Sequence, residues 1–233
     1  MPTEMMLRYF EKQPEKSIFT AHELYLQKFS GMTEAAFLKA LERMSYKGQL
    51  VRLSKGVYCK PAQTRFGTAA AGEHEITSYF TGENHRYGFV TGYHLYNKYG
   101  LSTQISKKVE VYSKKSPAMR STVQHIQIYK LKSFYRPNML SMIEFLEILE
   151  HYREIEDLNQ KAFMKYCSMA VKKFDENVVG KVYLQMGYKK RTLAFLKNIL
   201  DIYQVSNTLK RYLNGTSKYQ IPKWKTEGCF IET

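Results

Sequence analysis

The residues whose types come nearest to catalytic chemistry are Glu73, His74 and Glu75. A His-Glu pair opens the zinc-protease motif His-Glu-x-x-His, but that motif needs a second histidine at position 78, which is Ser. The six histidines are scattered, and no acidic residue has a lysine two positions later, the spacing that a restriction-nuclease-like core needs. Signatures of a P-loop, a Rossmann fold and a nucleophile elbow are also absent. The sequence therefore predicts no catalytic site, cofactor or metal. The alternative is an enzyme, such as a nuclease, whose carboxylates meet only in the folded chain.

Charge points to another kind of chemistry, the binding of a polyanion. The 233 residues include 36 Lys and Arg against 21 Asp and Glu, a net charge of +15. Such an excess favours a nucleic-acid partner, because each neutralised phosphate releases condensed counterions. A solvated basic surface, or a face for a membrane or an acidic protein, would account for the same charge. The local pattern has to decide between these explanations.

Within the first sixty residues, a helix from Thr33 to about Lys47 has one apolar stripe and one basic face. Phe37, Leu38, Leu41 and Met44 recur at i, i+1, i+4 and i+7, so this stripe is expected to face inward. The opposite face presents Lys39, Arg43 and Tyr46 at i, i+4 and i+7, with the acids Glu34 and Glu42 on the same helix. The predicted DNA-binding residues are Lys39, Arg43, Tyr46, Lys47, Arg52, Lys55 and Lys60.

The elements that must position these residues follow one another without a long gap. A helix is expected up to Lys12, then an extended piece at 17–19, then a helix opened by the capping box Thr20…Glu23. After a turn at 29–32 comes the helix just described, followed by β runs at 50–53 and 57–60 that Ser54-Lys55-Gly56 joins. This order predicts a winged helix-turn-helix, whose third helix enters the major groove. A winged helix that binds a protein partner is the alternative.

Beyond this module the pattern predicts a second domain. Residues 62–72, small and poor in large apolar side chains, read as a linker. Helices are expected at 73–81 and at 92–99, and Thr91 is expected to cap the second of them. Strands are expected at 108–113 and 123–130, on either side of a basic loop at 114–120. Further helices are expected at 141–150 (opened by a Ser141…Glu144 box), 159–174, 176–186, 190–203 and 206–213. The fold class is therefore α+β: a winged helix-turn-helix at 1–61, a linker at 62–72, and a mixed, mainly helical domain with a small β-sheet at 73–233.

Charge in the second half of the chain is uneven. Six acidic residues between 141 and 157 stand against Arg153 alone, which suggests a face that repels DNA or receives a basic partner. Bases dominate 181–225, with tyrosines between them, and suggest a second DNA-contacting surface or simply solvated helix faces. The members predicted for this second basic surface are Lys189, Lys190, Arg191, Lys197, Lys210 and Arg211.

Neither a secreted nor a membrane protein is indicated. Cys59, Cys167 and Cys229 are odd in number and far apart, which suggests neither a disulfide framework nor a zinc site. No signal peptide is visible, and no apolar run approaches the roughly 20 residues that span a bilayer. A cytoplasmic protein is expected.

Three segments together resemble the AbiEi antitoxin family of type IV toxin–antitoxin, abortive-infection systems: residues 17–24 (SIFTAHEL), 48–58 (GQLVRLSKGVY) and 91–104 (TGYHLYNKYGLSTQ). The resemblance covers roughly residues 5–130, and the tail has more Lys and Tyr than the family pattern. It implies a bacterial transcriptional autorepressor that binds inverted repeats of double-stranded promoter DNA and counteracts a nucleotidyltransferase-like toxin. By position, the family's DNA contacts fall on Lys39, Arg43, Arg52 and Lys55. The alternatives are a winged-helix interaction protein and a DNA-binding regulator without a toxin.

Overall fold

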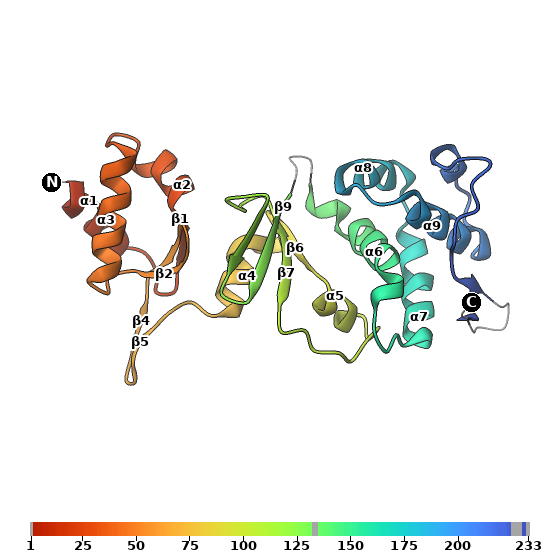
Figure 1. Ribbon diagram of the computed structural model, residues 1–233, viewed down its shortest axis with the longest axis horizontal. Coiled ribbons are helices and arrows are strands. Elements are labelled where there is room, and N and C mark those ends of the chain that lie inside the picture. The colour runs from red at the N-terminus through yellow and green to blue at the C-terminus, as the bar shows by residue number, and fades with distance from the viewer. Residues whose placement is uncertain (1, 132–134, 225–229, 232–233) are drawn as a thin grey trace. The chain divides into compact units, whose positions relative to one another are not determined.

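The computed structural model describes residues 2–131, 135–224 and 230–231, which form a mixed α+β fold with small sheets (Figure 1). The chain divides into two compact units. Unit 1 is Met1–Phe89 with Glu110–Leu131, and unit 2 is Val90–Val109 with Lys132–Thr233. This division differs from the predicted boundary at 62–72, because residues 110–131 return to unit 1; residues 1–61 as a domain of their own stay a prediction.

The first sixty residues follow the predicted order of elements. They are α1 (Pro2–Glu11), β1 (Ile18–Thr20), α2 (Ala21–Leu24), the π-helical η1 (Tyr25–Phe29), α3 (Glu34–Tyr46), β2 (Val51–Ser54) and β3 (Val57–Cys59). The three strands form an antiparallel sheet in the order β1-β3-β2. Arg52 lies opposite Tyr58 in this sheet. The second predicted helix is therefore split into one α turn and one π turn.

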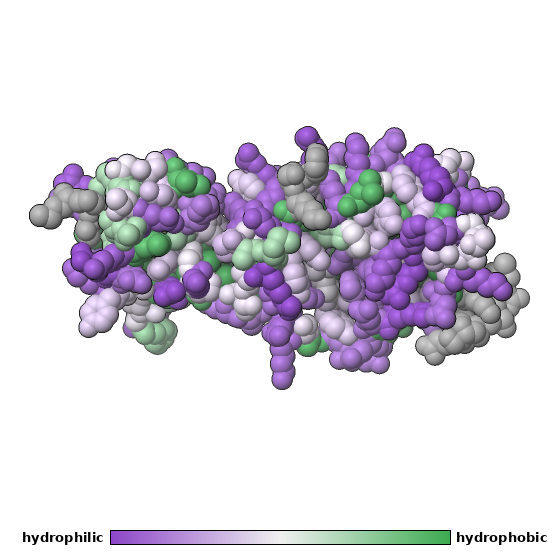
Figure 2. Space-filling view, turned by 45° about the horizontal axis from the view of Figure 1, so that its top comes forward, coloured by the Kyte–Doolittle hydropathy of each residue, from purple (hydrophilic) through white to green (hydrophobic). Residues whose placement is uncertain are grey.

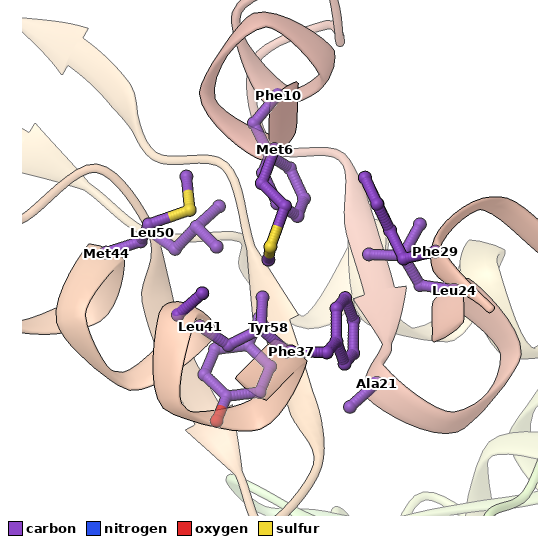
Figure 3. Packing of buried hydrophobic residues seen from close by; sticks show 11 residues of the cluster. Met6, Phe10, Ala21, Leu24, Phe29, Phe37, Leu41, Met44, Leu50 and Tyr58 are labelled. Atoms are coloured by element: carbon purple, nitrogen blue, oxygen red, sulfur yellow. The ribbon is translucent and has the colours of Figure 1, made fainter. Parts of the chain in front are cut away.

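One hydrophobic core lies beneath α3 (Figure 3). Phe37, Leu41 and Met44 from α3 pack in a cluster that also contains Phe29 and Tyr58. Burial of each such side chain stabilises the fold by roughly 1.5–3 kcal/mol. Leu38 was expected in this stripe but is 41% exposed. It follows Phe37 by one residue, about 100° around the helix, which turns it away from the centre of the buried face.

The helix caps agree only in part with the sequence patterns. The side chain of Thr33 accepts a hydrogen bond from the backbone N–H of Ala36 (3.3 Å), as expected for the N-cap of α3. Thr20 precedes α2 but makes no side-chain cap; its hydroxyl lies 3.3 Å from the carboxylate of Glu23 and 3.3 Å from the Tyr79 hydroxyl. The predicted capping box is therefore wrong, because Tyr79, distant in sequence, binds both of its side chains.

The predicted linker is also wrong, because residues 62–69 form an antiparallel hairpin of β4 (Ala62–Thr64) and β5 (Gly67–Ala69). The rest of unit 1 contains α4 (Glu73–Thr81) and the 3-10 turn η2 (Glu83–His85). A sheet ordered β6-β7-β9-β8 follows, and its strands β6 and β7 each have residues in both units. These strands are β6 (Gly88–Thr91), β7 (Val109–Ser113), β8 (Arg120–Val123) and β9 (Ile126–Lys130). The single strand predicted at 123–130 is thus two strands around a turn at Gln124, whose φ is +54°.

Unit 2 is mainly helical. Its elements are α5 (Tyr93–Lys98), η3 (Pro137–Met139), α6 (Leu140–Glu150), η4 (Tyr152–Glu154), α7 (Gln160–Ala170), η5 (Val171–Lys173), α8 (Glu176–Met186), α9 (Lys190–Ile202), η6 (Leu209–Tyr212), β10 (Lys223–Trp224) and β11 (Phe230–Ile231). The helices predicted from 141 to 203 are confirmed, whereas 206–213 contains only a 3-10 turn. None of the helices in the described ranges is both long and apolar enough to cross a bilayer.

Two predicted helix starts in unit 2 are wrong. Thr91 does not cap α5, because the N-cap is Gly92 at φ +65° and the buried Thr91 hydroxyl donates to Glu147. Ser141 lies inside α6, which begins at Leu140, and its expected box partner Glu144 bonds Lys98 and Tyr99 instead. In both places a buried glutamate attracts donors that local sequence spacing does not reveal.

Candidate nucleic-acid interface

The exposed side of α3 carries the first group of predicted contact residues. Lys39, Arg43 and Lys47 follow one another at four-residue spacing, which places them on one side of the helix. All three are exposed, and Tyr46 is 94% exposed. Within the described residues none of the three cations forms an ion pair. The basic side of α3 is therefore available to an anionic partner.

Arg52 on β2 is the next predicted contact residue, and it is exposed. Because Arg52 is opposite Tyr58 in the ladder, their side chains lie on the same face of the sheet. Burial raises the pKa of the Tyr58 hydroxyl; the charge of Arg52 lowers this pKa, and that of Glu42 on α3 raises it. The Nε–H of Arg52 donates to the carbonyl of Ser54 (3.4 Å), which directs the guanidinium along the turn.

Lys55 stands in the turn between β2 and β3 and is exposed. Gly56 follows it at φ +75°, a left-handed conformation that glycine adopts without steric cost. The carbonyl of Gly56 accepts a hydrogen bond from the backbone N–H of Ala21 (2.8 Å), so the turn is attached to the start of α2. Lys55 is therefore held on a short, fixed turn.

Lys60 does not join this group. Its Nζ donates to the carbonyl oxygens of Glu11 (2.8 Å) and Gln13 (2.7 Å), and the side chain is half-buried. A cation at the C-terminal end of a helix compensates unpaired carbonyls and the helix dipole. The predicted phosphate contact at Lys60 is therefore corrected to a structural role at the end of α1.

The candidate site consists of the remaining five cations, Lys39, Arg43, Lys47, Arg52 and Lys55, together with Tyr46. Glu34 and Glu42 are exposed on the same helix. Five positive against two negative charges leave +3 on this surface. The surface is cationic overall, and Glu42 supplies an acceptor within it.

Residues beyond position 60 hold the start of α2 in place, and the sequence reasoning missed them. The hydroxyl of Tyr79 on α4 donates to Glu23 (3.1 Å) and lies 3.3 Å from the Thr20 hydroxyl. The ammonium of Lys115 lies 4.1 Å from the ring centroid of Tyr79 and 4.4 Å from that of Tyr87. Burial raises the pKa of Tyr79 and lowers that of Lys115. Lys115, expected in a free basic loop, therefore stabilises the interior of unit 1.

Three of the six residues of the second predicted basic surface form ion pairs within unit 2. Lys189 pairs with Glu150 (3.6 Å), Lys197 with Asp201 (2.5 Å) and Arg211 with Glu176 (3.1 Å). Lys190 donates to the Asn214 side chain (2.6 Å), and Arg191 to the carbonyl of Glu150 (3.5 Å). Lys210 is exposed and has no ion pair in the described part of the chain. Half of the charge of this predicted surface is therefore paired within unit 2, and DNA contact by these residues stays a prediction.

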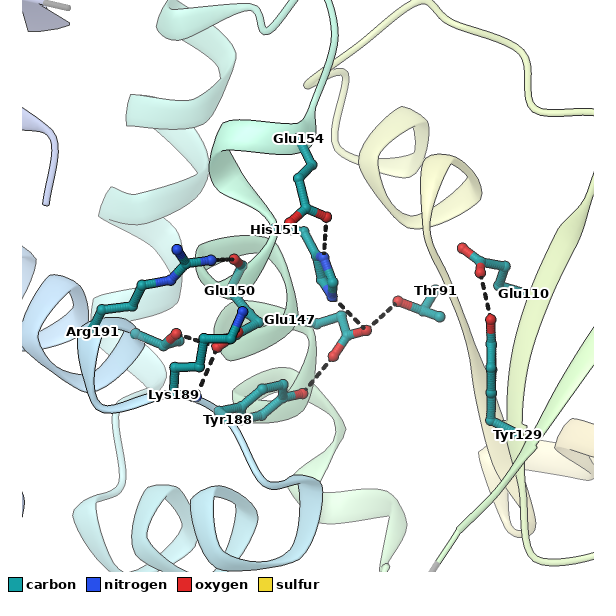
Figure 4. A network of polar contacts seen from close by, with 11 residues as sticks. Thr91, Glu110, Tyr129, Glu147, Glu150, His151, Glu154, Tyr188, Lys189 and Arg191 are labelled. Carbon is teal, nitrogen blue, oxygen red and sulfur yellow. Dashed lines mark hydrogen bonds and ion pairs between the residues drawn. The ribbon is translucent and has the colours of Figure 1, made fainter. Parts of the chain in front are cut away.

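Two glutamates of the acidic stretch, Glu144 and Glu147, are buried on α6. Figure 4 shows Glu147 between the hydroxyls of Thr91 and Tyr188. Glu147 is 3% exposed and accepts hydrogen bonds from the hydroxyls of Thr91 (2.9 Å) and Tyr188 (2.6 Å). Glu144 accepts from Lys98 (2.7 Å) and Tyr99 (2.5 Å). Both glutamates are buried acceptors of hydrogen bonds within unit 2, so the predicted acidic outer face is wrong for both of them.

The cysteines and possible metal ligands are the remaining chemical groups to place. Among them, no group of three His, Cys, Asp or Glu side chains is placed to hold a metal ion. Cys59 and Cys167 are buried free thiols, and burial raises the pKa of each. Cys229 lies outside the described residues. The face seen in Figure 2 is mostly hydrophilic, with hydrophobic side chains in small separate groups.

Comparison with known proteins gives a family but no activity. Residues 9–148 match a family described as "Family of unknown function (DUF6088)". No curated protein matches the chain. Among solved structures, the RV2827C protein from Mycobacterium tuberculosis is similar over 86% of this chain and 76% of its own, with 10% sequence identity and a TM-score of 0.42. That likeness is too distant to carry an argument.

Proposed function

Because the chain belongs to the DUF6088 family, whose function is unknown, we propose a function from its own residues: unit 1 binds double-stranded DNA. In this proposal α1 to α3 and the sheet β1-β3-β2 act as a winged helix, with α3 in the major groove. The observation that carries the proposal is the exposed basic side of α3, free of ion pairs among the described residues, together with the exposed Arg52 and Lys55 of the β2–β3 hairpin.

The dimensions and chemistry of these elements suit a duplex. A helix with its side chains is about 10–12 Å wide, and the major groove is about 12 Å wide. Lys39 and Arg43, near the middle of α3, contact base edges, where guanine offers two acceptors to a basic side chain. Arg52 and Lys55 on the hairpin contact phosphates and fix the orientation of α3. Glu42 accepts from the amino group of a cytosine.

The biological role in this proposal is that of an antitoxin and transcriptional autorepressor. It is supported by the resemblance of residues 17–24, 48–58 and 91–104 to AbiEi antitoxins. Two copies on inverted repeats of the promoter would repress the operon, since a symmetric site matches a pair of identical recognition helices. The partner is then a nucleotidyltransferase-type toxin encoded beside this gene.

A salt titration tests DNA binding. Fluorescence anisotropy would follow the whole chain on a duplex from upstream of its own gene and on an unrelated duplex. With Arg52 and Lys55 on phosphates, log affinity should fall with log salt with a slope of about −1.8 per bound copy, −0.9 for each contact. A flat response, or no binding to either duplex, would contradict the proposal and favour a winged helix that binds protein.

The antitoxin role is tested separately. A nucleotidyltransferase encoded beside this gene should arrest growth when expressed alone, and co-expression of this chain should relieve the arrest. If no such gene lies beside it, or if the arrest persists, the antitoxin role is wrong. The salt titration would still decide whether the chain is a DNA-binding regulator without a toxin.

A further inference from the structure

The tip of the β4–β5 hairpin exposes a large aromatic side chain that contributes nothing to the core. Phe66 is 92% exposed, and Arg65 beside it is also exposed. The guanidinium of Arg65 lies 5.9 Å from the centroid of the Phe66 ring, so the two side chains stand together. Both belong to the segment that the sequence predicted to be a linker. Arginine and phenylalanine are side-chain types that minor-groove-binding proteins use for recognition and for insertion between base steps.

Hydrogen bonds hold the tip and the base of the hairpin. The Thr64 hydroxyl donates to the carbonyl of Gly67 (2.7 Å) and accepts from the backbone N–H of Phe66 (3.2 Å). Gly67 has φ +109°, which closes the turn without strain. At the base, Ala62 is buried, and the backbone N–H of Gln63 donates to Glu15 (3.3 Å). Arg65 and Phe66 are therefore presented with little ordering cost on binding.

Charge and shape of the hairpin favour a nucleic-acid groove over an acidic protein face. Between residues 62 and 69 the chain has one base and no acid. Figure 1 shows the hairpin as a separate finger that projects beyond the lower end of α3. The minor groove is about 6 Å wide and attracts arginine most strongly where A·T pairs narrow it. Exposed phenylalanines insert between base steps in minor-groove complexes.

We propose that the β4–β5 hairpin is a second DNA-contacting element, with Arg65 in the minor groove and Phe66 packed against a base step. This inference rests on the proposed function, because it places the hairpin next to a major groove that α3 occupies. The hairpin would add a preference for A·T pairs next to the site that α3 contacts. This preference would come from the width of the minor groove and not from base edges in the major groove.

Three synthetic duplexes test the inference without knowledge of the natural site. The alternating duplexes dA-dT and dG-dC differ in both grooves. An alternating dI-dC duplex, which lacks the minor-groove amino group of guanine, has the minor groove of dA-dT and the major groove of dG-dC. The wild-type chain should bind dA-dT and dI-dC about tenfold more tightly than dG-dC. Arg65→Ala should remove this preference while retaining binding to all three.

Two further variants sharpen the test. Arg86→Ala, a loss of one charge elsewhere in unit 1, should keep the ratio of affinities among the three duplexes. Phe66→Ala should reduce the rise in 2-aminopurine fluorescence that an unstacked base step produces when the wild-type chain binds. Circular dichroism and sedimentation of each free variant would verify its fold and its state of association.

The results separate the two proposals. Equal, salt-dependent binding of the wild type to all three duplexes, or an unchanged preference in Arg65→Ala, would overturn the hairpin inference and leave DNA binding standing. Binding of the wild type to none of them would contradict DNA binding itself. If Phe66→Ala changes only the sedimentation of the free protein, the tip is a contact between copies of the chain, and the inference is wrong.

Discussion

The Nζ atom of Lys16 lies 2.8 Å from Oε1 of Glu75, in an ion pair that joins the segment before β1 to the first turn of α4. The other carboxylate oxygen of Glu75 accepts from the backbone N–H of Gly72 (2.9 Å), the N-cap of α4. One glutamate thus connects the elements of the candidate winged helix to the helix that carries Tyr79. The bond from Lys16 lowers the pKa of Glu75 to about 2, with a smaller contribution from backbone donors.

Replacement of this carboxylate should change stability in a pH-dependent way. Glu75→Gln should lower the free energy of unfolding by about 1 kcal/mol at pH 7, since a partly exposed charge-assisted bond is lost. A lowered pKa means that this contribution is complete above the usual value of 4.5 and disappears as the pH falls from 4.5 towards 2. Urea unfolding followed by circular dichroism between pH 7 and pH 3 would measure the difference from wild type.

Glu83→Gln is the matched control for this experiment, because Glu83 is exposed on η2 and forms no ion pair in the described residues. Its difference from wild type should be small and independent of pH. A Glu75→Gln difference that stays constant down to pH 3 would show that the ion pair with Lys16 does not stabilise unit 1.

Loss of a cation that contacts bases and loss of a cation that contacts phosphates should weaken DNA binding in different ways. Arg43→Ala, on α3, should weaken binding to the preferred sequence by about tenfold and reduce the preference itself, because a base contact is lost. Lys55→Ala, in the hairpin turn, should weaken binding to every duplex alike and make the salt slope shallower by about 0.9. Anisotropy titrations on preferred and unrelated duplexes at several salt concentrations would measure both effects.

Lys172, exposed on η5 of unit 2, offers a control with the same change of charge. Lys172→Ala should leave both the preference and the salt slope unaltered. If Arg43→Ala and Lys55→Ala bind the preferred duplex with wild-type affinity and slope, the assignment of the contact surface to α3 and the turn is wrong.

Lys60 should affect folding and not DNA binding. Lys60→Ala removes the two bonds from its Nζ to the carbonyls of Glu11 and Gln13 at the end of α1. We expect the free energy of unfolding to fall by about 1–2 kcal/mol, while the salt slope of DNA binding stays that of the wild type. Lys12→Ala, exposed at the end of the same helix, should cost less stability. A salt slope shallower by about 0.9 in Lys60→Ala would restore Lys60 as a phosphate contact.

The stability of unit 2 should depend on the hydroxyl of Tyr188, which donates to the buried carboxylate of Glu147. Tyr188→Phe removes a 2.6 Å hydrogen bond to Glu147 and leaves the carboxylate under-satisfied. The expected loss is about 1.5–3 kcal/mol, the range for a hydrogen bond to a charged group. Tyr183→Phe is the control, since Tyr183 is only partly buried and its ring makes an edge-to-face contact with Tyr212, without a hydrogen bond from its hydroxyl in the described residues. Equal unfolding midpoints for the two variants in urea would contradict this role of Tyr188.

Features that depend on neighbours a few residues apart could be predicted from the sequence. The stripe of Phe37, Leu41 and Met44 identifies the buried side of α3, and with it the exposed position of Lys39 and Arg43, because helical periodicity is a local property. The cap at Thr33 and the glycine of the β2–β3 turn follow for the same reason. The family resemblance rests on such local runs, and the antitoxin role that it implies stays a proposal.

Only the tertiary structure decided which charged side chains are free. Lys60 meets a carbonyl 49 residues away, and Glu147 meets hydroxyls 56 and 41 residues away, so no local spacing could reveal that one is a helix cap and the other a buried acceptor. The sequence did not reveal the exposed pair of Arg65 and Phe66 at the tip of the β4–β5 hairpin, because the small and polar residues around them are typical of a linker. A charge is available to a partner only where the folded chain leaves it without a counter-charge or carbonyl, and that depends on contacts between distant segments.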